Sequence, residues 1–168
     1  MTLAADLLDQ AGHLAAREPG RPKQASLRRA ISAAYYSLFH LVVDDATRYL
    51  VGGASVRSAI ARSFDHQAMR AAAEALGAVA RKPTATHWFR PHLHDPIAQD
   101  LMVVCDTIVE LQEQRHKADY DTGLTFTRLQ SNGAVSLAIR AHAVWPRERN
   151  TQNARAFMLA AAKLIRSR

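Results

Sequence analysis

Apolar residues recur at intervals of three and four positions along most of this chain, a spacing that gathers them on one face of an α-helix. One such stripe, with steps of four, three, four and four, consists of Leu27, Ile31, Ala34, Leu38 and Val42. No segment alternates apolar and polar residues over the length of a β-strand. The pattern therefore predicts an all-α protein.

Helix-breaking residues divide this pattern into segments. The expected helices cover about residues 2–17, 23–51, 55–80, 127–145 and 150–166, and one more begins near Pro96 or Ile97. The breaks include REPGRP at 17–22, Gly52 with Gly53, and the proline-rich segment 81–96, while Pro146 is expected to stop the helix before it. Because short connections favour antiparallel neighbours, residues 1–168 are expected to form one domain, an antiparallel bundle of about five to six helices.

Side chains suited to cap helix ends support several of these boundaries. Thr2, Ser55 and Asp95 can accept hydrogen bonds from the first free backbone N–H groups of the helices that follow them. Thr127 and Gln130 have the spacing of a capping box, in which each side chain bonds the other residue's backbone. We therefore expect helices to start next to these residues.

The charge and the cysteine content narrow the choice of environment and partners. A net charge of +7 over 168 residues favours polyanionic partners such as RNA, DNA or an acidic protein. The single cysteine, Cys105, cannot form a disulfide within the chain, so a cytoplasmic location is expected. No apolar run approaches the roughly 20 residues that span a membrane, and the acidic N-terminal segment lacks the features of a signal peptide.

The helix that begins near residue 97 carries an arginine where an apolar side chain is expected. Its stripe consists of Ile97, Leu101, Val104, Ile108 and Leu111, and the next position is Arg115. A guanidinium keeps its proton, so a buried Arg115 must be paired or must face a cleft. If the helix continues for one more turn, Asp119 can pair with it. The alternative is a plain helix end, where cations offset the helix dipole and the pair is only a local bridge.

The helix expected over residues 23–51 offers a complement to this arginine. Arg29, Tyr36 and His40 share a stripe that flanks the core stripe. Such a face at a seam of the bundle can bind a phosphate or a partner helix. The alternative is that Tyr36 packs with its hydroxyl at the rim and that His40 is a hydrogen-bonded histidine at the edge of the core.

These two segments together resemble the HEPN superfamily. The first is LRRAISAAYYSLFH at 27–40, and the second, QRHKADYD at 114–121, follows about 75 residues later. The similarity is to a bacterial branch with R-x-A-I-S-x-A-Y-Y-x-x-F-H on one helix and R-x-x-A-D-Y at the end of a later helix. The matching residues are Arg29, Ala30, Ile31, Ser32, Tyr35, Tyr36, Phe39 and His40, then Arg115, Ala118, Asp119 and Tyr120.

The resemblance implies a helical bundle that dimerises so that the two arginine-bearing helix ends face each other. Many HEPN proteins are metal-independent endoribonucleases, often toxins paired with a nucleotidyltransferase-like antitoxin. In that chemistry the motif arginine stabilises charge on the phosphate. A histidine moves protons for the attack of the RNA 2′-hydroxyl.

The proton-transfer group is the point at which this chain departs from the family motif, which is Arg, four to six residues, then His. The corresponding positions here hold Tyr120, Asp121 and Thr122. His116 is adjacent to Arg115, and adjacent residues on a helix point about 100° apart. The remaining candidates are His116 at a frayed helix end, His40, or a residue of a partner subunit.

Two functional hypotheses follow from the resemblance and the charge. In the first, a homodimer binds or cleaves single-stranded RNA, with Arg115 on the phosphate and His116 or His40 moving protons. The residues expected to bind the phosphate or nucleic acid are Arg29, Tyr36, Asp119 and Tyr120. In the second, a non-catalytic HEPN module pairs with a nucleotidyltransferase-like partner or binds a nucleotide, and Arg115, Asp119 and Tyr120 stabilise the helix end and the dimer seam. Neither hypothesis requires a cofactor or a metal ion.

The segment HWFRPHLHD at 87–95 raises the question of a metal site, because His92 and His94 have an H-x-H spacing. Pro91 interrupts the segment and no second ligand cluster is evident, so no metal site is expected. We predict a surface loop in which Trp88 and Phe89 either anchor it to the bundle or contact a partner. The chain also contains neither a Gly-rich phosphate loop nor a nucleophile elbow.

Overall fold

The computed structural model describes residues 2–84 and 86–165, apart from the side chains of Ala54 and Ser55. This part of the chain contains seven α-helices, one short 3-10 helix and no β-strand. The helices are α1 (Leu3–Ala16), α2 (Gln24–Leu50), α3 (Ala54–Ala61), α4 (His66–Arg81), η1 (Arg90–His92), α5 (Gln99–Tyr120), α6 (Arg128–Glu148) and α7 (Gln152–Ala161). The prediction of an all-α bundle is confirmed.

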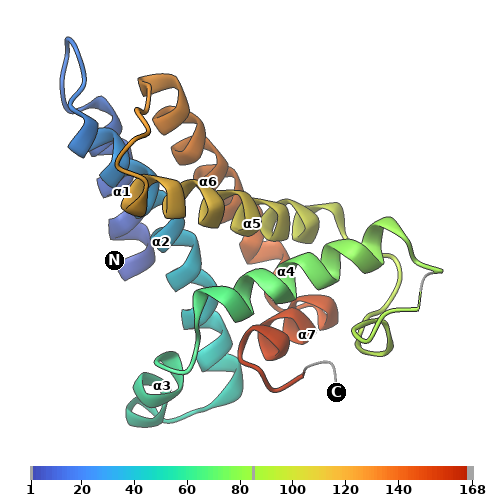
Figure 1. Ribbon diagram of the computed structural model, residues 1–168. Helices are drawn as coiled ribbons and strands as arrows, with labels where there is room; N and C mark the ends of the chain where they lie inside the picture. The colour runs from blue at the N-terminus through green and yellow to red at the C-terminus, as the bar shows by residue number, and fades with distance from the viewer. Residues whose placement is uncertain (1, 85, 166–168) are drawn as a thin grey trace.

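The long helix α2 is the centre of the packing (Figure 1). It contacts α1, α5 and α6. Helix α4 lies along α5 and also packs against α7. The predicted core stripe of α2, from Leu27 to Val42, is fully buried. Leu101, Val104, Ile108 and Leu111 of the α5 stripe are also almost fully buried. Both stripes therefore face the core, as the periodicity predicts.

The prediction of a single helix over residues 55–80 is wrong, because the structure has two helices in this part of the chain, α3 and α4. Asp65 has an extended backbone and its Oδ1 accepts a hydrogen bond of 2.7 Å from the N–H of Ala68. This cap satisfies a free donor at the start of a new helix, so the chain turns before residue 66. Ser55 lies inside α3, which has Gly53 at its N-cap, and the Ser55 side chain lies outside the described part of the chain.

Asp95 does not cap the helix that follows it, contrary to the prediction. Helix α5 begins at Gln99 and has Ala98 at its N-cap, without a side-chain hydrogen bond. The carboxylate of Asp95 instead pairs with the guanidinium of Arg90. The predicted cap of Thr2 and the capping box of Thr127 and Gln130 are both present.

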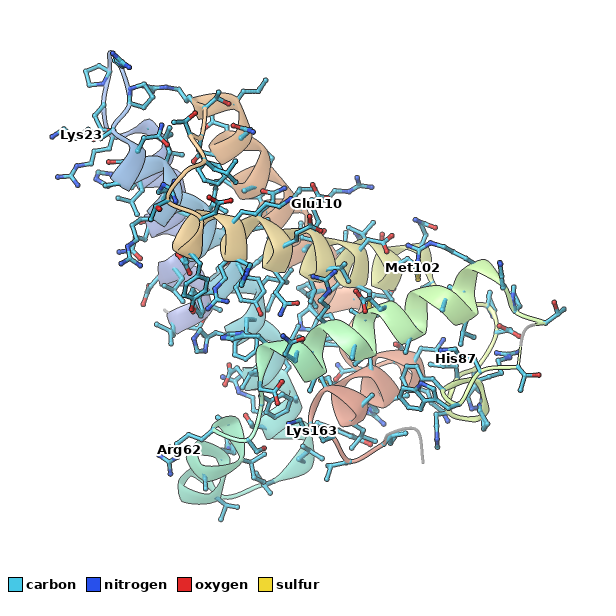
Figure 2. The ribbon with its side chains drawn as sticks, viewed as in Figure 1. Lys23, Arg62, His87, Met102, Glu110 and Lys163 are labelled. Carbon is cyan, nitrogen blue, oxygen red and sulfur yellow. The ribbon has the colours of Figure 1, made fainter. Side chains whose placement is uncertain are left out.

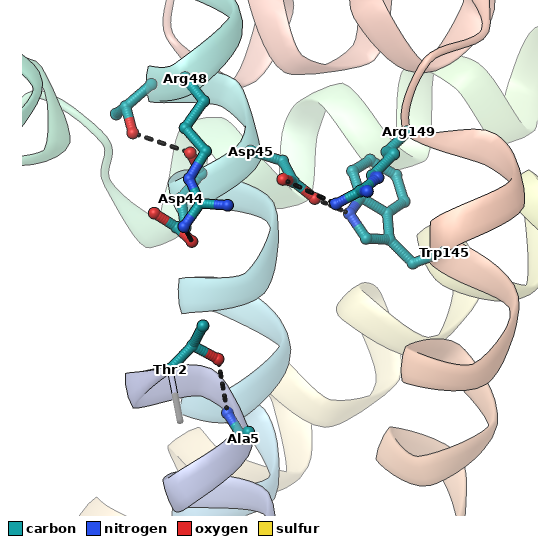
Figure 3. A network of polar contacts seen from close by, with 8 residues as sticks. Thr2, Ala5, Asp44, Asp45, Arg48, Trp145 and Arg149 are labelled. Atoms are coloured by element: carbon teal, nitrogen blue, oxygen red, sulfur yellow. Dashed lines mark hydrogen bonds and ion pairs between the residues drawn. The ribbon is translucent and has the colours of Figure 1, made fainter. Parts of the chain in front are cut away.

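Pro146 does not stop α6, which continues to Glu148. Proline lacks the N–H that would bond the carbonyl four residues earlier, but the next turn still closes, with Arg149 N–H donating to Trp145 O at 2.9 Å. Trp145 is fully buried, and its indole Nε1–H donates to Asp45 on α2 at 2.7 Å (Figure 3). Tertiary packing of this turn therefore outweighs the missing hydrogen bond.

The last helix is shorter than the predicted 150–166. Helix α7 ends at Ala161, and Lys163 then adopts a positive φ of 60°. The N–H of Leu164 bonds Leu159 O at 2.9 Å, which closes the helix with a Schellman turn. Residue 166 lies outside the described residues. None of the described helices is both long enough and apolar enough to cross a membrane.

Candidate functional site

The C-terminal end of α5 is held against α2 by an arginine that the sequence did not single out. Arg28 Nη1 donates to the carbonyl of Ala118 at 2.7 Å, and its Nη2 donates to Asp121 O at 2.9 Å. The Nη2 group also donates to Leu124 O, and the guanidinium lies 5.2 Å from the ring centroid of Phe126. Arg28 thereby satisfies free carbonyls at the end of α5 and fixes the last turn of that helix.

Arg115 lies in this last part of α5 and is only 9% exposed. Its Nη2 donates to the hydroxyl of Tyr36 on α2 at 2.8 Å. Its Nε lies 3.1 Å from Asp119 Oδ2, so the pair predicted from the spacing is present. That contact is an ion pair without hydrogen-bond alignment, since the buried Nε has no hydrogen-bond partner among the described residues. Asp119 Oδ1 in turn accepts a hydrogen bond from the Ser32 hydroxyl.

Three tyrosine rings surround the Arg115 guanidinium. Its Cζ lies 5.3 Å from the ring centroid of Tyr36, 5.6 Å from that of Tyr120 and 5.8 Å from that of Tyr35. Burial opposes the charge, but the hydrogen bond to Tyr36 and the nearby Asp119 together raise the pKa of Arg115. The faces of aromatic rings also favour a cation. The site therefore holds a fixed positive charge in a partly desolvated setting.

His66 is a member of this site that sequence reasoning missed. It is the first residue of α4, and its Nδ1 lies 2.7 Å from the Tyr35 hydroxyl. Its ring centroid is 4.6 Å from that of Phe39, and Gln112 Nε2 donates to its backbone carbonyl at 3.0 Å. No local pattern could have identified it, because residue 66 is far in sequence from both motifs. Recognising Asp65 as a helix cap would have placed it at a helix start.

The His66 ring is biased towards its neutral form. Burial is the main cause that lowers the pKa of His66, and the positive charge of Arg115 lowers it further. The ring is half-buried, and Nε2 is neither hydrogen-bonded nor buried among the described residues. A neutral imidazole with one free nitrogen at a cleft can exchange a proton with a bound molecule.

Two solvent-open clefts meet at Arg115. The first, called here the histidine cleft, has a volume of about 700 Å³ and is lined by Asp65, His66, Gln67, Arg70, Gln112, Arg115, His116 and Tyr120. The second, called the arginine cleft, has a volume of about 650 Å³ and is lined by Gln24, Ala25, Arg28, Arg29, Tyr36, Arg115, Ala118, Asp119, Tyr120, Thr122, Leu124 and Thr125. Arg115 and Tyr120 line both, so they form the boundary between the two clefts.

The other predicted site residues fall into two groups. His116 is exposed in the histidine cleft, with its ring centroid 5.1 Å from that of Tyr120. Arg29 is exposed in the arginine cleft and forms no ion pair among the described residues. His40 stacks on Tyr36 at 6.3 Å, but it lines a third cleft beside α1 and α3. Burial lowers the pKa of His40.

The histidine-containing loop lies away from this site, at the far end of the α4–α5 pair, where Figure 2 labels His87. Phe89 is fully buried and Trp88 packs against the core, so these residues anchor the loop. The side chain of Asn153 bonds both the N–H and the carbonyl of His94 at 2.8 Å. Among residues 2–84 and 86–165, no three His, Cys, Asp or Glu side chains are grouped so that they could hold a metal ion.

The two sequence motifs meet at this site, since Ser32 and Tyr36 of the first contact Asp119 and Arg115 of the second. Comparisons with protein-family models, with curated proteins and with solved structures gave no match for the chain. Membership of the HEPN superfamily therefore stays a prediction from the motifs.

Proposed function

We propose that this chain is a HEPN-like protein that binds single-stranded RNA at Arg115 and cleaves it as a metal-independent endoribonuclease. The observation that carries this proposal is the position of Arg115, a nearly buried cation on the boundary between two open clefts. Its Nη1 forms no hydrogen bond among the described residues, so it has donors to offer to a phosphate oxygen.

The charge around Arg115 suits a polyanion. Arg28 and Arg29 lie in the arginine cleft, and Arg70 lies in the histidine cleft. A strand that crosses the boundary would meet arginines on both sides, although Arg70 is paired with Glu74 at 2.7 Å, and such arginines favour binding of successive phosphates. The overall charge of +7 acts in the same direction.

An exposed aromatic ring on the boundary favours unpaired bases over a duplex. Tyr120 is 65% exposed and lines both clefts. An unpaired base can stack on such a ring, whereas bases inside an A-form duplex cannot reach it. Single-stranded RNA is therefore the substrate class that we propose.

The proposed reaction is transesterification within the RNA. The 2′-oxygen attacks the adjacent phosphorus, the bond from phosphorus to the 5′-oxygen breaks, and a 2′,3′-cyclic phosphate forms. Arg115 stabilises the negative charge that grows on the phosphoryl oxygens. The 2′-hydroxyl loses a proton and the leaving 5′-oxygen gains one, so a proton-transfer group must lie beside Arg115.

The test is cleavage of a labelled single-stranded RNA by the purified protein in EDTA. Wild type is compared with Arg115→Ala, with Arg115→Lys, which keeps the charge, and with Arg62→Ala as an exposed control outside both clefts. Cleavage by wild type and Arg62→Ala, but not by folded Arg115→Ala, supports the proposal. Equal cleavage by Arg115→Ala, or none by wild type, contradicts it.

A non-catalytic HEPN module is the second candidate. The hydrogen bond to Tyr36 and the ion pair to Asp119 give Arg115 a structural role between α2 and α5, and this observation favours it. Under this alternative the chain dimerises through its α5 ends and pairs with a nucleotidyltransferase-like partner or binds a nucleotide. Arg115→Ala would then lower either the melting temperature or the dimer affinity, the latter measured by light scattering. Neither wild type nor this variant would cleave RNA.

A further inference from the structure

We propose that His66 is the residue that takes the proton from the RNA 2′-hydroxyl, and that Tyr35 is the residue that positions it. This inference rests on the proposed function. The chain has no histidine at the usual motif position after Arg115, and His66 would take over its role in proton transfer. It assigns proton transfer to α4, a helix that belongs to neither motif.

The surroundings of His66 fix the orientation of its ring. The Tyr35 hydroxyl lies 2.7 Å from Nδ1, and the rings of Phe39 and Tyr36 lie 4.6 Å and 5.6 Å away, centroid to centroid. Asp65 caps α4, and Lys163 pairs with that carboxylate, so the start of the helix is also held. With Nδ1 occupied by Tyr35, Nε2 is the nitrogen left to act in the histidine cleft.

His66 and Arg115 both contact Tyr35, which is called here the aromatic platform. The Arg115 Cζ lies 5.8 Å from the ring centroid of Tyr35, and the hydroxyl of the same tyrosine contacts His66. Both residues line the histidine cleft. A phosphate bound at Arg115 would therefore lie in a cleft that His66 also lines, so His66 is a candidate for proton transfer to or from its ribose.

The other two histidines are less suited to the role. His116 is exposed, and its ring has only a contact with Tyr120 to orient it among the described residues. His40 is in contact with Tyr36 but lines the third cleft, beside Thr2 and Arg57. Neither combines a hydrogen bond at one ring nitrogen with a free nitrogen beside Arg115.

In the proposed reaction, every proton and bond has a stated origin and destination within the RNA, His66 and solvent. His66 Nε2 takes the 2′-hydroxyl proton as the bond from the 2′-oxygen to phosphorus forms and the bond to the 5′-oxygen breaks. Solvent supplies a proton to the leaving 5′-oxygen, and His66 then returns its proton to solvent. Throughout, Nδ1–H donates to the Tyr35 oxygen. Burial raises the pKa of Tyr35, so that phenol stays protonated.

The experiment is single-turnover cleavage of single-stranded RNA in EDTA across a range of pH. The variants are His66→Asn, whose amide can keep the hydrogen bond to Tyr35, and His66→Gln, whose amide reaches towards the position of Nε2. Controls are Arg115→Ala and His92→Gln, an exposed histidine on the distant loop. Binding of the same RNA by fluorescence anisotropy and folding by circular dichroism are measured for each variant.

We expect each folded His66 variant to lose about 100-fold or more in rate, the usual contribution of a general base, with RNA affinity little changed. The limb of the pH–rate profile due to His66 should disappear. Tyr35→Phe should keep RNA binding but shift that limb, which a purely structural role of Tyr35 would not do. His92→Gln should behave as wild type.

The outcomes separate this inference from the proposed function. Near-wild-type rates in both His66 variants, together with an inactive Arg115→Ala, overturn the role of His66 and leave the nuclease proposal standing. No cleavage by wild type overturns both. Loss of rate in whichever His66 variant folds and binds RNA supports both.

Discussion

The Tyr36 hydroxyl lies 2.8 Å from Nη2 of Arg115, although the two residues are 79 positions apart in sequence. This hydrogen bond joins the middle of α2 to the last turns of α5. It places the guanidinium where two clefts meet and beside the ring of Tyr35, whose hydroxyl contacts His66. The candidate site therefore depends on a contact between helices as much as on the identity of the arginine.

Tyr36→Phe tests the contribution of this hydrogen bond. The change keeps the ring beside Arg115 but removes the oxygen that accepts from Nη2, leaving a charged donor without its partner. We expect a loss of about 1–3 kcal/mol in the free energy of unfolding, measured by urea denaturation. Tyr49→Phe is the control, because Tyr49 is 46% exposed and its hydroxyl has no hydrogen bond among the described residues. Equal stabilities of the two variants would contradict the prediction.

Replacement by alanine should lower stability at Arg28 but not at the adjacent Arg29. Arg28 donates to three backbone carbonyls after position 117, so Arg28→Ala should lower stability by about 1.5–3 kcal/mol. Hydrogen exchange in residues 118–124 should rise as well. Arg29 is exposed and unpaired among the described residues, so Arg29→Ala should leave stability unchanged.

The same pair also gives a binding measurement. If RNA follows the arginine cleft, Arg29→Ala should reduce the slope of log affinity against log salt concentration by about 1, as expected for one lost phosphate contact. An unchanged slope with unchanged affinity would place the RNA elsewhere.

Asp44 and Asp45 are a second matched pair, on α2. Asp45 accepts a hydrogen bond from the buried Trp145 indole and lies 3.4 Å from Arg149 Nη1, and its side chain is 12% exposed (Figure 3). Asp45→Ala should cost about 1–3 kcal/mol because the indole N–H loses its acceptor. Asp44 pairs only with Arg48 at the surface, so Asp44→Ala should change stability by less than about 1 kcal/mol. Urea unfolding monitored by tryptophan fluorescence measures both, and a larger effect at Asp44 would be contrary to this account.

Three half-buried histidines predict an acid-sensitive fold. Burial lowers the pKa of His40, His66 and His142, so these three side chains bind fewer protons near pH 6 in the folded protein than in the unfolded chain. The free energy of unfolding should therefore fall as the pH drops from roughly 7 to 5, through the unfolded histidine pKa of about 6.5. The fold is expected to be most stable above that value, where all three rings are neutral.

His142 gives the sharpest test of this pH dependence, because its Nε2 is buried without a hydrogen-bond partner among the described residues. In His142→Leu one of the three groups can no longer titrate, so the decrease in unfolding free energy between these pH values should be smaller than in wild type. Urea denaturation at each pH measures the difference. His13→Leu, which replaces an exposed histidine of α1, is measured beside it as the control.

Local sequence was sufficient to predict several features of the fold and one contact of the site. The spacing of apolar residues on α2 and α5 predicted which faces are buried, because a helix places positions three and four apart on one side. The same spacing predicted the Arg115–Asp119 pair, which lies within one helix. The capping box of Thr127 and Gln130 was also readable, since all of its partners lie within four residues.

Two helix boundaries predicted from local sequence were wrong, at Pro146 and at Asp95. Pro146 was expected to stop α6, but the buried Trp145 beside it and its bond to Asp45 hold the next turn in place. Asp95 has the right residue type for a cap, but α5 begins only at Gln99, and the Asp95 carboxylate pairs with Arg90. Neither outcome follows from the residue type alone.

The sequence by itself determined an all-helical chain, the buried stripes, and an arginine at an apolar position of α5. Only the tertiary structure decided that Tyr36 bonds this arginine, that Arg28 holds the end of α5, and that His66 lies on the same aromatic platform. The physical reason is the separation in sequence of the residues that make contact. Helical periodicity specifies neighbours within a few residues on one helix, whereas the contacts of α2, α4 and α5 depend on how three helices pack across the core.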